Sequence, residues 1–267
     1  MKKLKKFLRP VGIAIAVLGV MLALGFVERT ADRTPINELQ VIVDGVEGIH
    51  FIDEHAVRRE VLDQGIAVMG SPTAEVDVTR IEKRLRSIPC VAKAEAYHTM
   101  DGTLHVKVKQ REPIVRVFNS DGTSFYIDRE GWTMPTNANY TARVLVVTGQ
   151  LNEPGAEDGV YSVLANDSLR NFFRSDDIHR IATFIGKDPF WSALIDQVVV
   201  NADGEYELIP RVGAQRVLIG DGTALDQRFE KLRIFYDKGI PKADWRRYAR
   251  IDLRFDDQIV CTKRTTP

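Results

Sequence analysis

Residues 78–111 read VTRIEKRLRSIPCVAKAEAYHTMDGTLHVKVKQR, and this stretch decides the fold of the first half of the chain. An apolar residue recurs every three or four positions at Val78, Ile81, Leu85 and Ile88, which predicts one apolar stripe along a helix. Pro89 then ends the helix. Two strands are expected next, at residues 90–98 and 103–111, with a turn at Asp101-Gly102 between them. In the second strand apolar residues alternate with polar ones, which is typical of a strand with one buried face.

The sequence before this stretch supplies another strand and another helix. Apolar residues alternate with polar or edge positions over residues 39–43, and Asp44-Gly45 predicts a turn there. A helix is expected to begin after Asp53, whose side chain can cap it, and to end at Gly65. The order over residues 39–111 is therefore strand, helix, helix, strand, strand.

This order resembles the POTRA domain. Three motifs carry a second resemblance: Ile88-Pro89-Cys90-Val91-Ala92-Lys93-Ala94, Leu104-His105-Val106-Lys107-Val108 and Gln110-Arg111-Glu112-Pro113-Ile114-Val115. They resemble the signature of the bacterial cell-division family FtsQ, also called DivIB, in which P-x-V-x-x-A precedes an alternating strand and E-R-x-P. Gln110 departs from that signature, because the family usually has Glu at this position.

Residues 112–262 are expected to form a mostly antiparallel β-domain with inserted helices. Turns at Ser120-Asp121-Gly122 and Ala202-Asp203-Gly204 each separate two strands, and helices are expected at residues 168–173, 176–185 and 225–236. The resemblance extends here through Phe125-Tyr126-Ile127-Asp128-Arg129-Glu130-Gly131 and the closing Ile251-Asp252-Leu253-Arg254-Phe255. It is thinnest between residues 148 and 191. The fold class that follows is α+β.

The N-terminus predicts a membrane anchor. Lys2, Lys3, Lys5, Lys6 and Arg9 precede a run from Val11 to Val27 that has no polar side chain. A span needs ~17–25 apolar residues, and the cations place the N-terminus in the cytoplasm. We expect a cytoplasmic tail at residues 1–9, a transmembrane helix at 10–27, a linker at 28–38, the POTRA domain at 39–111 and, after the β-domain, a C-terminal tail at 263–267. The body then lies in the periplasm, anchored in the inner membrane.

A cleaved secretory signal is the alternative to this anchor. Its apolar region would run ~7–15 residues and end in a site of small residues. The apolar run here is longer, and Gly25-Phe26-Val27-Glu28 is a poor cleavage site.

Motifs that would indicate an enzyme or a metal site are missing from the sequence. It contains no G-x-S-x-G, H-E-x-x-H, C-x-x-C or Walker A loop. His50 and His55 lie close together without a third ligand at zinc spacing, so both are expected to be solvated. Cys90 and Cys261 are expected to be buried, unbridged residues. A formal net charge of zero argues against nucleic acid as a partner. We therefore expect no catalysis, no cofactor and no metal.

The family resemblance implies a function. Such proteins are scaffolds without enzymatic activity that hold a small bitopic pair, FtsB and FtsL, at the division septum. Other divisome membrane proteins would be contacted through the POTRA domain and the transmembrane helix. A POTRA-containing translocation component is the alternative, but it would carry repeated POTRA units or lipid-facing barrel strands, and the sequence shows neither pattern. An anchored envelope hydrolase would need a nucleophile motif.

The closing strand is the expected partner site. It should cover residues 250–255 and continue, after a bend at Asp256-Asp257, into residues 258–262; no later segment would cover its edge. The residues expected to bind the partner by strand addition are Arg250, Asp252, Arg254, Gln258 and Val260. Ile251, Leu253 and Phe255 should face the core. An edge of the POTRA domain at residues 103–109 is the next candidate.

The basic N-terminal tail generates a test of topology. Protease added to spheroplasts is expected to remove the body and to leave a small membrane-protected fragment, because the cations hold the tail inside. Immunoblotting against tags at the two ends would measure this. Full protection of the body would contradict the predicted orientation.

Overall fold

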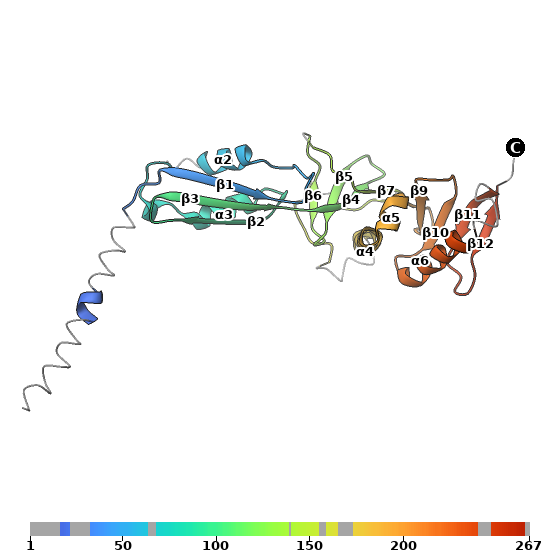
Figure 1. Ribbon diagram of the computed structural model, residues 1–267. Helices are drawn as coiled ribbons and strands as arrows, with labels where there is room; N and C mark the ends of the chain where they lie inside the picture. Colours follow the sequence, from blue (N-terminus) through green and yellow to red (C-terminus); the bar gives the residue numbers. More distant parts are fainter. Residues whose placement is uncertain are drawn as a thin grey trace, which may run out of the picture. The chain divides into compact units, whose positions relative to one another are not determined.

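The structure, a computed structural model, describes residues 17–21, 33–63, 68–138, 140–154, 159–164, 173–239 and 247–264. The chain divides into two compact units (Figure 1). The first unit comprises Met1–Asp44 and Ile52–Gln110, and the second comprises Gly45–Phe51 and Arg111–Pro267. No sequence pattern predicts that the short segment Gly45–Phe51 joins the second unit.

The first unit has the element order that the sequence predicts. Its elements are β1 (Glu38–Asp44), α2 (Glu54–Leu62), the short 3-10 turn η1 (Thr73–Glu75), α3 (Val78–Arg86), β2 (Val91–His98) and β3 (Thr103–Gln110). Each helix begins after an aspartate that caps it, and the first of these is the predicted Asp53. The Asp53 carboxylate accepts a hydrogen bond from the Ala56 N–H at 2.7 Å, and Asp77 accepts one from the Arg80 N–H at 2.9 Å.

The core of the first unit lies between the two helices and one face of its sheet. Val57 and Val61 of α2 and Ile81 and Leu85 of α3 are buried there. The alternate residues of β3 that the sequence assigns to the buried face are also in this core: Leu104, Val106 and Val108. Burial of this apolar surface is the main stabilising contribution that the unit can make.

The sheet of the first unit has the strand order β1-β3-β2, so β3 is the central strand. It pairs with β1 in parallel and with β2 in an antiparallel manner. The expectation of a free edge at residues 103–109 is therefore wrong. The alternation in β3 reports only which face is buried, and it carries no information on how many neighbours the strand has.

The second unit is built on one nine-stranded sheet with the order β12-β11-β10-β9-β8-β7-β4-β5-β6. The strands are β4 (Pro113–Phe118), β5 (Ser124–Asp128), β6 (Thr133–Pro135), β7 (Leu145–Gly149), β8 (Ile195–Val200), β9 (Tyr206–Pro210), β10 (Arg216–Gly220), β11 (Tyr248–Asp252) and β12 (Val260–Lys263). Both predicted hairpins are present, as β4–β5 and β8–β9. Three pairings that the sequence did not predict, β4–β7, β7–β8 and β10–β11, are parallel.

The helices of the second unit are α4 (Ser175–Lys187), α5 (Pro189–Leu194) and α6 (Leu225–Ile234), which a π-helical turn, η4 (Phe235–Gly239), extends. The predictions at residues 176–185 and 225–236 are confirmed, whereas α5 was not predicted. The helix expected at residues 168–173 falls almost entirely outside the described residues.

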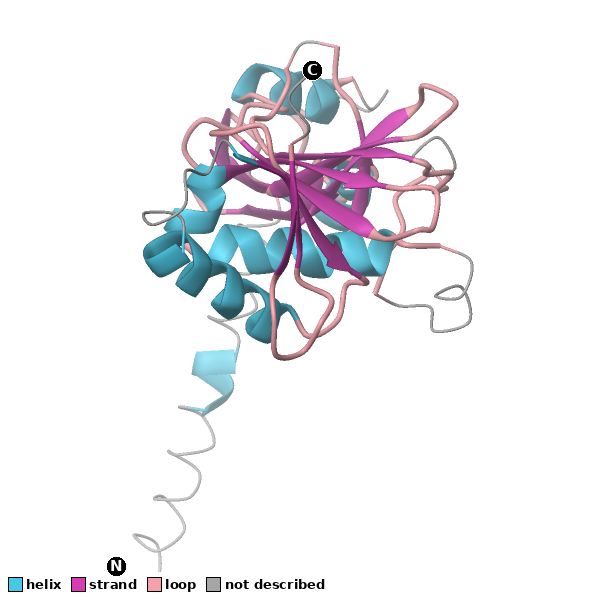
Figure 2. Cartoon of the chain, turned by 90° about the vertical axis from the view of Figure 1, so that its right-hand side faces the viewer, coloured by secondary structure: helices cyan, strands magenta, loops and turns pink. Residues whose placement is uncertain are grey.

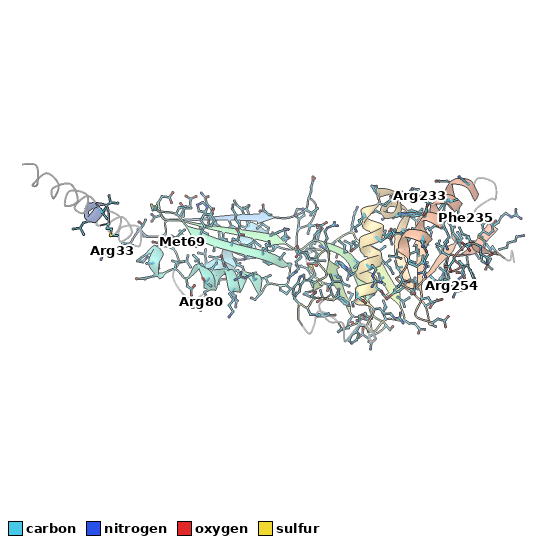
Figure 3. All side chains as sticks on the ribbon, turned by 90° about the horizontal axis from the view of Figure 1, so that it is seen from below. Arg33, Met69, Arg80, Arg233, Phe235 and Arg254 are labelled. Atoms are coloured by element: carbon cyan, nitrogen blue, oxygen red, sulfur yellow. The ribbon has the colours of Figure 1, made fainter. Side chains whose placement is uncertain are left out.

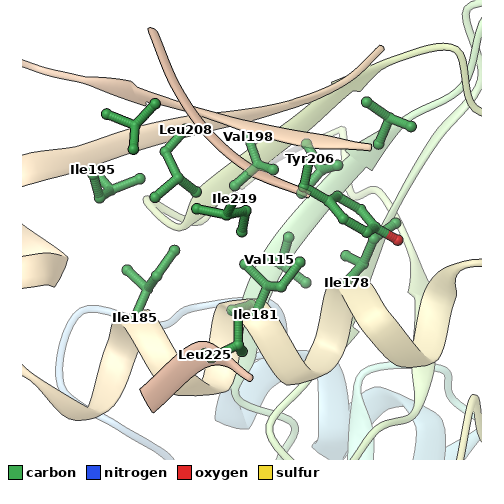
Figure 4. Close-up of a cluster of buried hydrophobic side chains, with 14 of the residues drawn as sticks. Val115, Ile178, Ile181, Ile185, Ile195, Val198, Tyr206, Leu208, Ile219 and Leu225 are labelled. Carbon is green, nitrogen blue, oxygen red and sulfur yellow. The ribbon is translucent and has the colours of Figure 1, made fainter. Parts of the chain in front are cut away.

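These helices share one apolar core with a single face of the sheet (Figure 2). Figure 4 shows Ile178, Ile181 and Ile185 of α4 directed at strand residues that include Val198 and Leu208. Trp191 of α5 and Phe229 of α6 are buried in the same cluster, with ring centroids 5.0 Å apart. Of the aromatic residues of α4 and α5, Trp191 is buried, Phe184 packs against the core and Phe190 is exposed.

The segment Gly45–Phe51 packs on aromatic residues of the second unit. The Phe51 ring lies 5.6 Å from the Tyr126 ring and 4.8 Å from the Tyr140 ring, both edge to face. The Asn137 side chain donates a hydrogen bond to the Phe51 carbonyl at 3.2 Å, and the Tyr140 hydroxyl donates one to the Gly48 carbonyl. These contacts account for the assignment of the segment to this unit.

Most of the expected membrane span at residues 10–27 lies outside the described residues. Residues 17–21 are described and are helical. No helix in the described part of the chain is both long and apolar enough to cross a membrane. Cys90 and Cys261 are free thiols, as predicted, but both are partly exposed rather than buried.

Leu85 tests the placement of α3. Its side chain is fully buried, so Leu85→Ala is expected to lower the free energy of unfolding by ~2–5 kcal/mol through lost burial and a residual cavity. Chemical denaturation would measure this. Leu62→Ala at the end of α2 is the matched control, because that side chain is 39% exposed and its loss should cost only about 0.5 kcal/mol. Equal effects of the two substitutions would contradict the packing.

Candidate functional site

The predicted closing strand is in fact two strands. β11 ends at Asp252, the chain turns over residues 253–259, and β12 runs back antiparallel beside β11. β11 is therefore an internal strand, since it also pairs in parallel with β10. The expectation of a single bent strand with its own free edge is wrong, because the bend at Asp256-Asp257 is part of a hairpin loop.

One row of charged side chains crosses the face of the sheet opposite the helical core. Glu207 of β9 is only 7% exposed and lies between two arginines. Its carboxylate oxygens are 3.2 Å from Arg216 Nη1 and 3.0 Å from Arg250 Nη2. Burying a carboxylate without a partner would cost roughly several kcal/mol of folding free energy. The two guanidinium groups offset this cost because each forms an ion pair with Glu207. The Arg250 side chain is thereby tied to β9.

Asp252 and Arg254 form a second charged group next to this row. Arg254 Nη2 lies 2.7 Å from Asp252 Oδ2, and Arg254 Nη1 lies 2.9 Å from Glu205 Oε1. Burial pushes the pKa of Asp252 upward, but hydrogen bonds from the Arg254 side chain and backbone outweigh it, so the pKa is lowered overall. The hydrogen bonds to Asp252 and then to Glu205 raise the pKa of Arg254.

The inner face of the hairpin matches the sequence at two positions out of three. Ile251 is 1% exposed and Leu253 is fully buried, as expected. Phe255, however, is 44% exposed, so its predicted place in the core is wrong. The strand ends at Asp252, and the regular alternation of faces ends with it. The Lys231 side chain of α6 donates a hydrogen bond to the Leu253 carbonyl at 3.0 Å and so ties the start of this loop to the helix.

The structure brings four of the five predicted site residues together. Arg250 belongs to the charged row, Asp252 and Arg254 form the charged group next to it, and Val260 of β12 lies directly opposite Asp252 in the register. Val260 is 40% exposed. Gln258 is exposed in the hairpin loop, apart from the charged group.

β12 is an open edge in the described part of the chain. The sheet order ends with this strand, and no described segment pairs with its outer side. The opposite edge is different, because residues 161–163 lie along β6: the Thr133 N–H donates to the Tyr161 carbonyl at 2.9 Å and the Val163 N–H donates to the Gly131 carbonyl at 2.8 Å. Of the two ends of the described sheet, β12 is the one with free backbone groups.

One hydrogen bond shows which backbone N–H and C=O groups of β12 face β11 and which face outward. The Arg264 N–H donates to the Arg247 carbonyl at 2.7 Å across the hairpin. Successive residues of a strand point their backbone groups to opposite edges. Thr262 and Val260 therefore point theirs at β11, and Lys263 and Cys261 point theirs outward.

Comparisons with known proteins identify the family. A family model for FtsQ/DivIB, C-terminal related, matches residues 112–262, which are more than half of the chain. The chain belongs to the FtsQ/DivIB family. A POTRA-like domain matches residues 36–109. The cell division protein FtsQ of Rhodothermus marinus is 25% identical to this chain over 229 residues, which cover 83% of this chain and 77% of that protein.

The FtsQ/DivIB match ends at Thr262, within β12, so it includes the hairpin with the open edge. Sequence reasoning missed the acidic residues of the site, Glu205 and Glu207. They lie more than 40 positions before Arg250 and Arg254, and only the pairings β9–β10 and β10–β11 bring them together. The alternation Glu205-Tyr206-Glu207 was the available signal, because it places both acids on one face of β9.

Asp252 generates a prediction with a defined pH dependence. Its folded-state pKa is lowered, so its carboxylate adds stability above its unfolded pKa of about 3.9, and that contribution is lost as the pH falls below it. Asp252→Asn is expected to lower the free energy of unfolding at pH 7 by about 1 kcal/mol, since Arg254 is partly exposed. The deficit should shrink as the pH falls below about 4, where wild type loses the same charge.

Urea denaturation of wild type and variant at several pH values would measure this. Asp256→Asn is the control, because Asp256 is exposed in the same hairpin loop and forms no ion pair with a described residue. A deficit that does not change with pH would show that the charge of Asp252 is not what stabilises the hairpin.

Proposed function

We propose that this protein is a non-enzymatic scaffold of the bacterial divisome, located at the division septum. In this proposal one N-terminal helix, residues 10–27, anchors it in the inner membrane, with its N-terminus in the cytoplasm and its body in the periplasm. The body recruits small bitopic division proteins that resemble FtsB and FtsL. A strand of such a partner pairs with β12 and so extends the sheet. Membership of the FtsQ/DivIB family supports the role in division.

The open edge of β12 is the observation that carries the strand-addition mechanism. An edge strand presents unpaired N–H and C=O groups that another chain can bind, and proteins normally cover or protect such edges. The β6 end of this sheet is covered by residues 161–163, whereas the β12 end is not covered by any described segment. An extended partner segment would satisfy the outward groups of Cys261 and Lys263, at about 0.5–1.5 kcal/mol for each hydrogen bond.

Side chains around the edge suggest what the partner segment carries. Phe255 and Val260 are 44% and 40% exposed on the hairpin, and an apolar residue of the partner could cover them. Lys263 and Arg264 are exposed beside them. The charges of Arg250, Asp252 and Arg254 are already matched within the protein, so they shape the hairpin rather than attract the partner. A partner strand with an apolar side chain flanked by acidic ones would fit this surface.

The test of the mechanism is a proline at the outward-facing Lys263. Lys263→Pro removes an N–H that points away from β11, so the body should stay folded but lose the partner. Lys263→Ala is the matched control, because it removes the charge and keeps the N–H; it should retain most of the affinity. Thr262→Pro removes an N–H that points at β11, and it should destabilise the hairpin itself.

Circular dichroism would report folding, and titration of the partner's periplasmic segment would report affinity. In cells depleted of the wild-type chain, Lys263→Pro should produce filaments and Lys263→Ala should divide. Unchanged affinity in a folded Lys263→Pro variant would rule out strand addition at β12. Normal division after depletion of the whole protein would overturn the divisome role.

A further inference from the structure

The chain enters the first unit through a short segment that is hydrogen-bonded on both sides. We call residues 34–37 the leading segment. On one side the Ile36 N–H donates to the Ser71 carbonyl at 2.9 Å, and the Gly70 N–H donates back to the Ile36 carbonyl at 2.8 Å. On the other side the Asn37 N–H donates to the Gly102 carbonyl at 2.9 Å. The leading segment is therefore held between the loop that precedes η1 and the turn between β2 and β3.

We call the hydrogen bonds on both sides of the leading segment the clamp, and Gly102 allows one side of it to approach closely. Its φ of +86° lies in the left-handed region, where a side chain is strained. A Cβ at this position would lie only 2.3 Å from the Pro35 carbonyl oxygen, so the turn touches the backbone of the leading segment directly. The direction in which the chain enters the unit is consequently set by backbone contacts rather than by a loose linker.

Apolar side chains surround this point of the first unit, which we call its leading end. Met100, in the turn beside Gly102, is 73% exposed, more than any other large hydrophobic side chain described in the first unit from residue 33 onward. Met69, in the opposite loop, is 42% exposed, and Pro35 and Ala74 are also exposed. Figure 3 labels Met69 and the cationic Arg33 at this end. Both methionines therefore present apolar surface to the solvent.

The proposed anchor determines what lies next to the leading end. If the span ends at Val27, five residues separate it from Arg33, and the six Cα–Cα steps between these two residues can reach at most about 22 Å whatever their conformation. The polar headgroup layer of a bilayer extends roughly 5–8 Å beyond the hydrocarbon on each side. The leading end must therefore stay near the membrane surface, and methionine is flexible and polarisable enough to enter an irregular lipid interface.

We propose that the leading end of the first unit rests on the outer surface of the bilayer, with Met69 and Met100 inserted in the interfacial layer. The clamp on the leading segment keeps these side chains turned toward the lipid. Arg33 lies where it can meet lipid phosphates. This inference rests on the membrane anchor of the proposed function and adds a second, shallow contact between the protein and the membrane.

The experiment uses the full chain reconstituted in vesicles of phosphatidylcholine and phosphatidylglycerol. In a Cys90→Ala, Cys261→Ala background, Met100→Cys carries an environment-sensitive fluorophore. Lys109→Cys is the matched control: it is exposed on β3, the strand that follows this turn, seven residues after Gly102 and about 23 Å along the strand from the leading end. Circular dichroism checks that both variants are folded. Lipids with a nitroxide near the headgroup serve as quenchers.

The probe at Met100 is expected to emit at shorter wavelength in vesicles and to lose emission when nitroxide lipid is added, and the probe at Lys109 to do neither. Alkaline carbonate extraction of the same vesicles tests the anchor separately. A chain that resists extraction while both probes emit as in water would overturn the lipid contact and leave the anchor standing. If carbonate removes the chain from the vesicles, the proposed anchor is wrong, and the proposed lipid contact is wrong with it.

Discussion

Backbone hydrogen bonding at the two ends of one sheet is the constraint on which the second unit depends. Nine strands covered by helices on a single face need no further strand to complete their core, but each end strand has a row of N–H and C=O groups to satisfy. The short segment at residues 161–163 does so at β6. At β12 the described chain provides nothing equivalent. The asymmetry between these ends, rather than any cavity or catalytic group, is what points to a partner.

The charged row on the opposite face of the sheet stabilises the pairing of β10 with β11. Parallel pairing of β10 with β11 brings Arg216 beside Arg250, and two guanidinium groups in register would repel each other. Glu207, from the next strand, lies within hydrogen-bonding distance of both and removes that repulsion. Asp252, the last residue of β11, forms an ion pair with Arg254 in the loop that follows. The hairpin that carries the open edge is thus fixed to the sheet by electrostatics on one face and by Ile251 and Leu253 on the other.

Local patterns predicted the elements of the first unit well, although not the order of its strands. The caps at Asp53 and Asp77, the stripe through Leu85 and the buried residues of β3 all depend on neighbours within a few positions. The errors concern pairing between distant segments. Alternation in β3 could not reveal that it lies between β1 and β2, and alternation around Phe255 could not reveal that β11 had already ended. The sequence therefore indicated the C-terminal segment as the candidate site, but not the hairpin that makes β12 the edge strand.

The aromatic packing of Gly45–Phe51 has a consequence for any attempt to take the protein apart. Because this segment is counted with the second unit, the polypeptide passes from one unit to the other three times, after Asp44, after Phe51 and after Gln110. A fragment that starts at Arg111 lacks Phe51 and exposes the rings of Tyr126 and Tyr140 that it covers. Conversely, a single proteolytic nick after Gln110 would leave Gly45–Phe51, which belong to the second unit, on the first fragment. A division of the chain at residue 111 therefore leaves out part of the second unit.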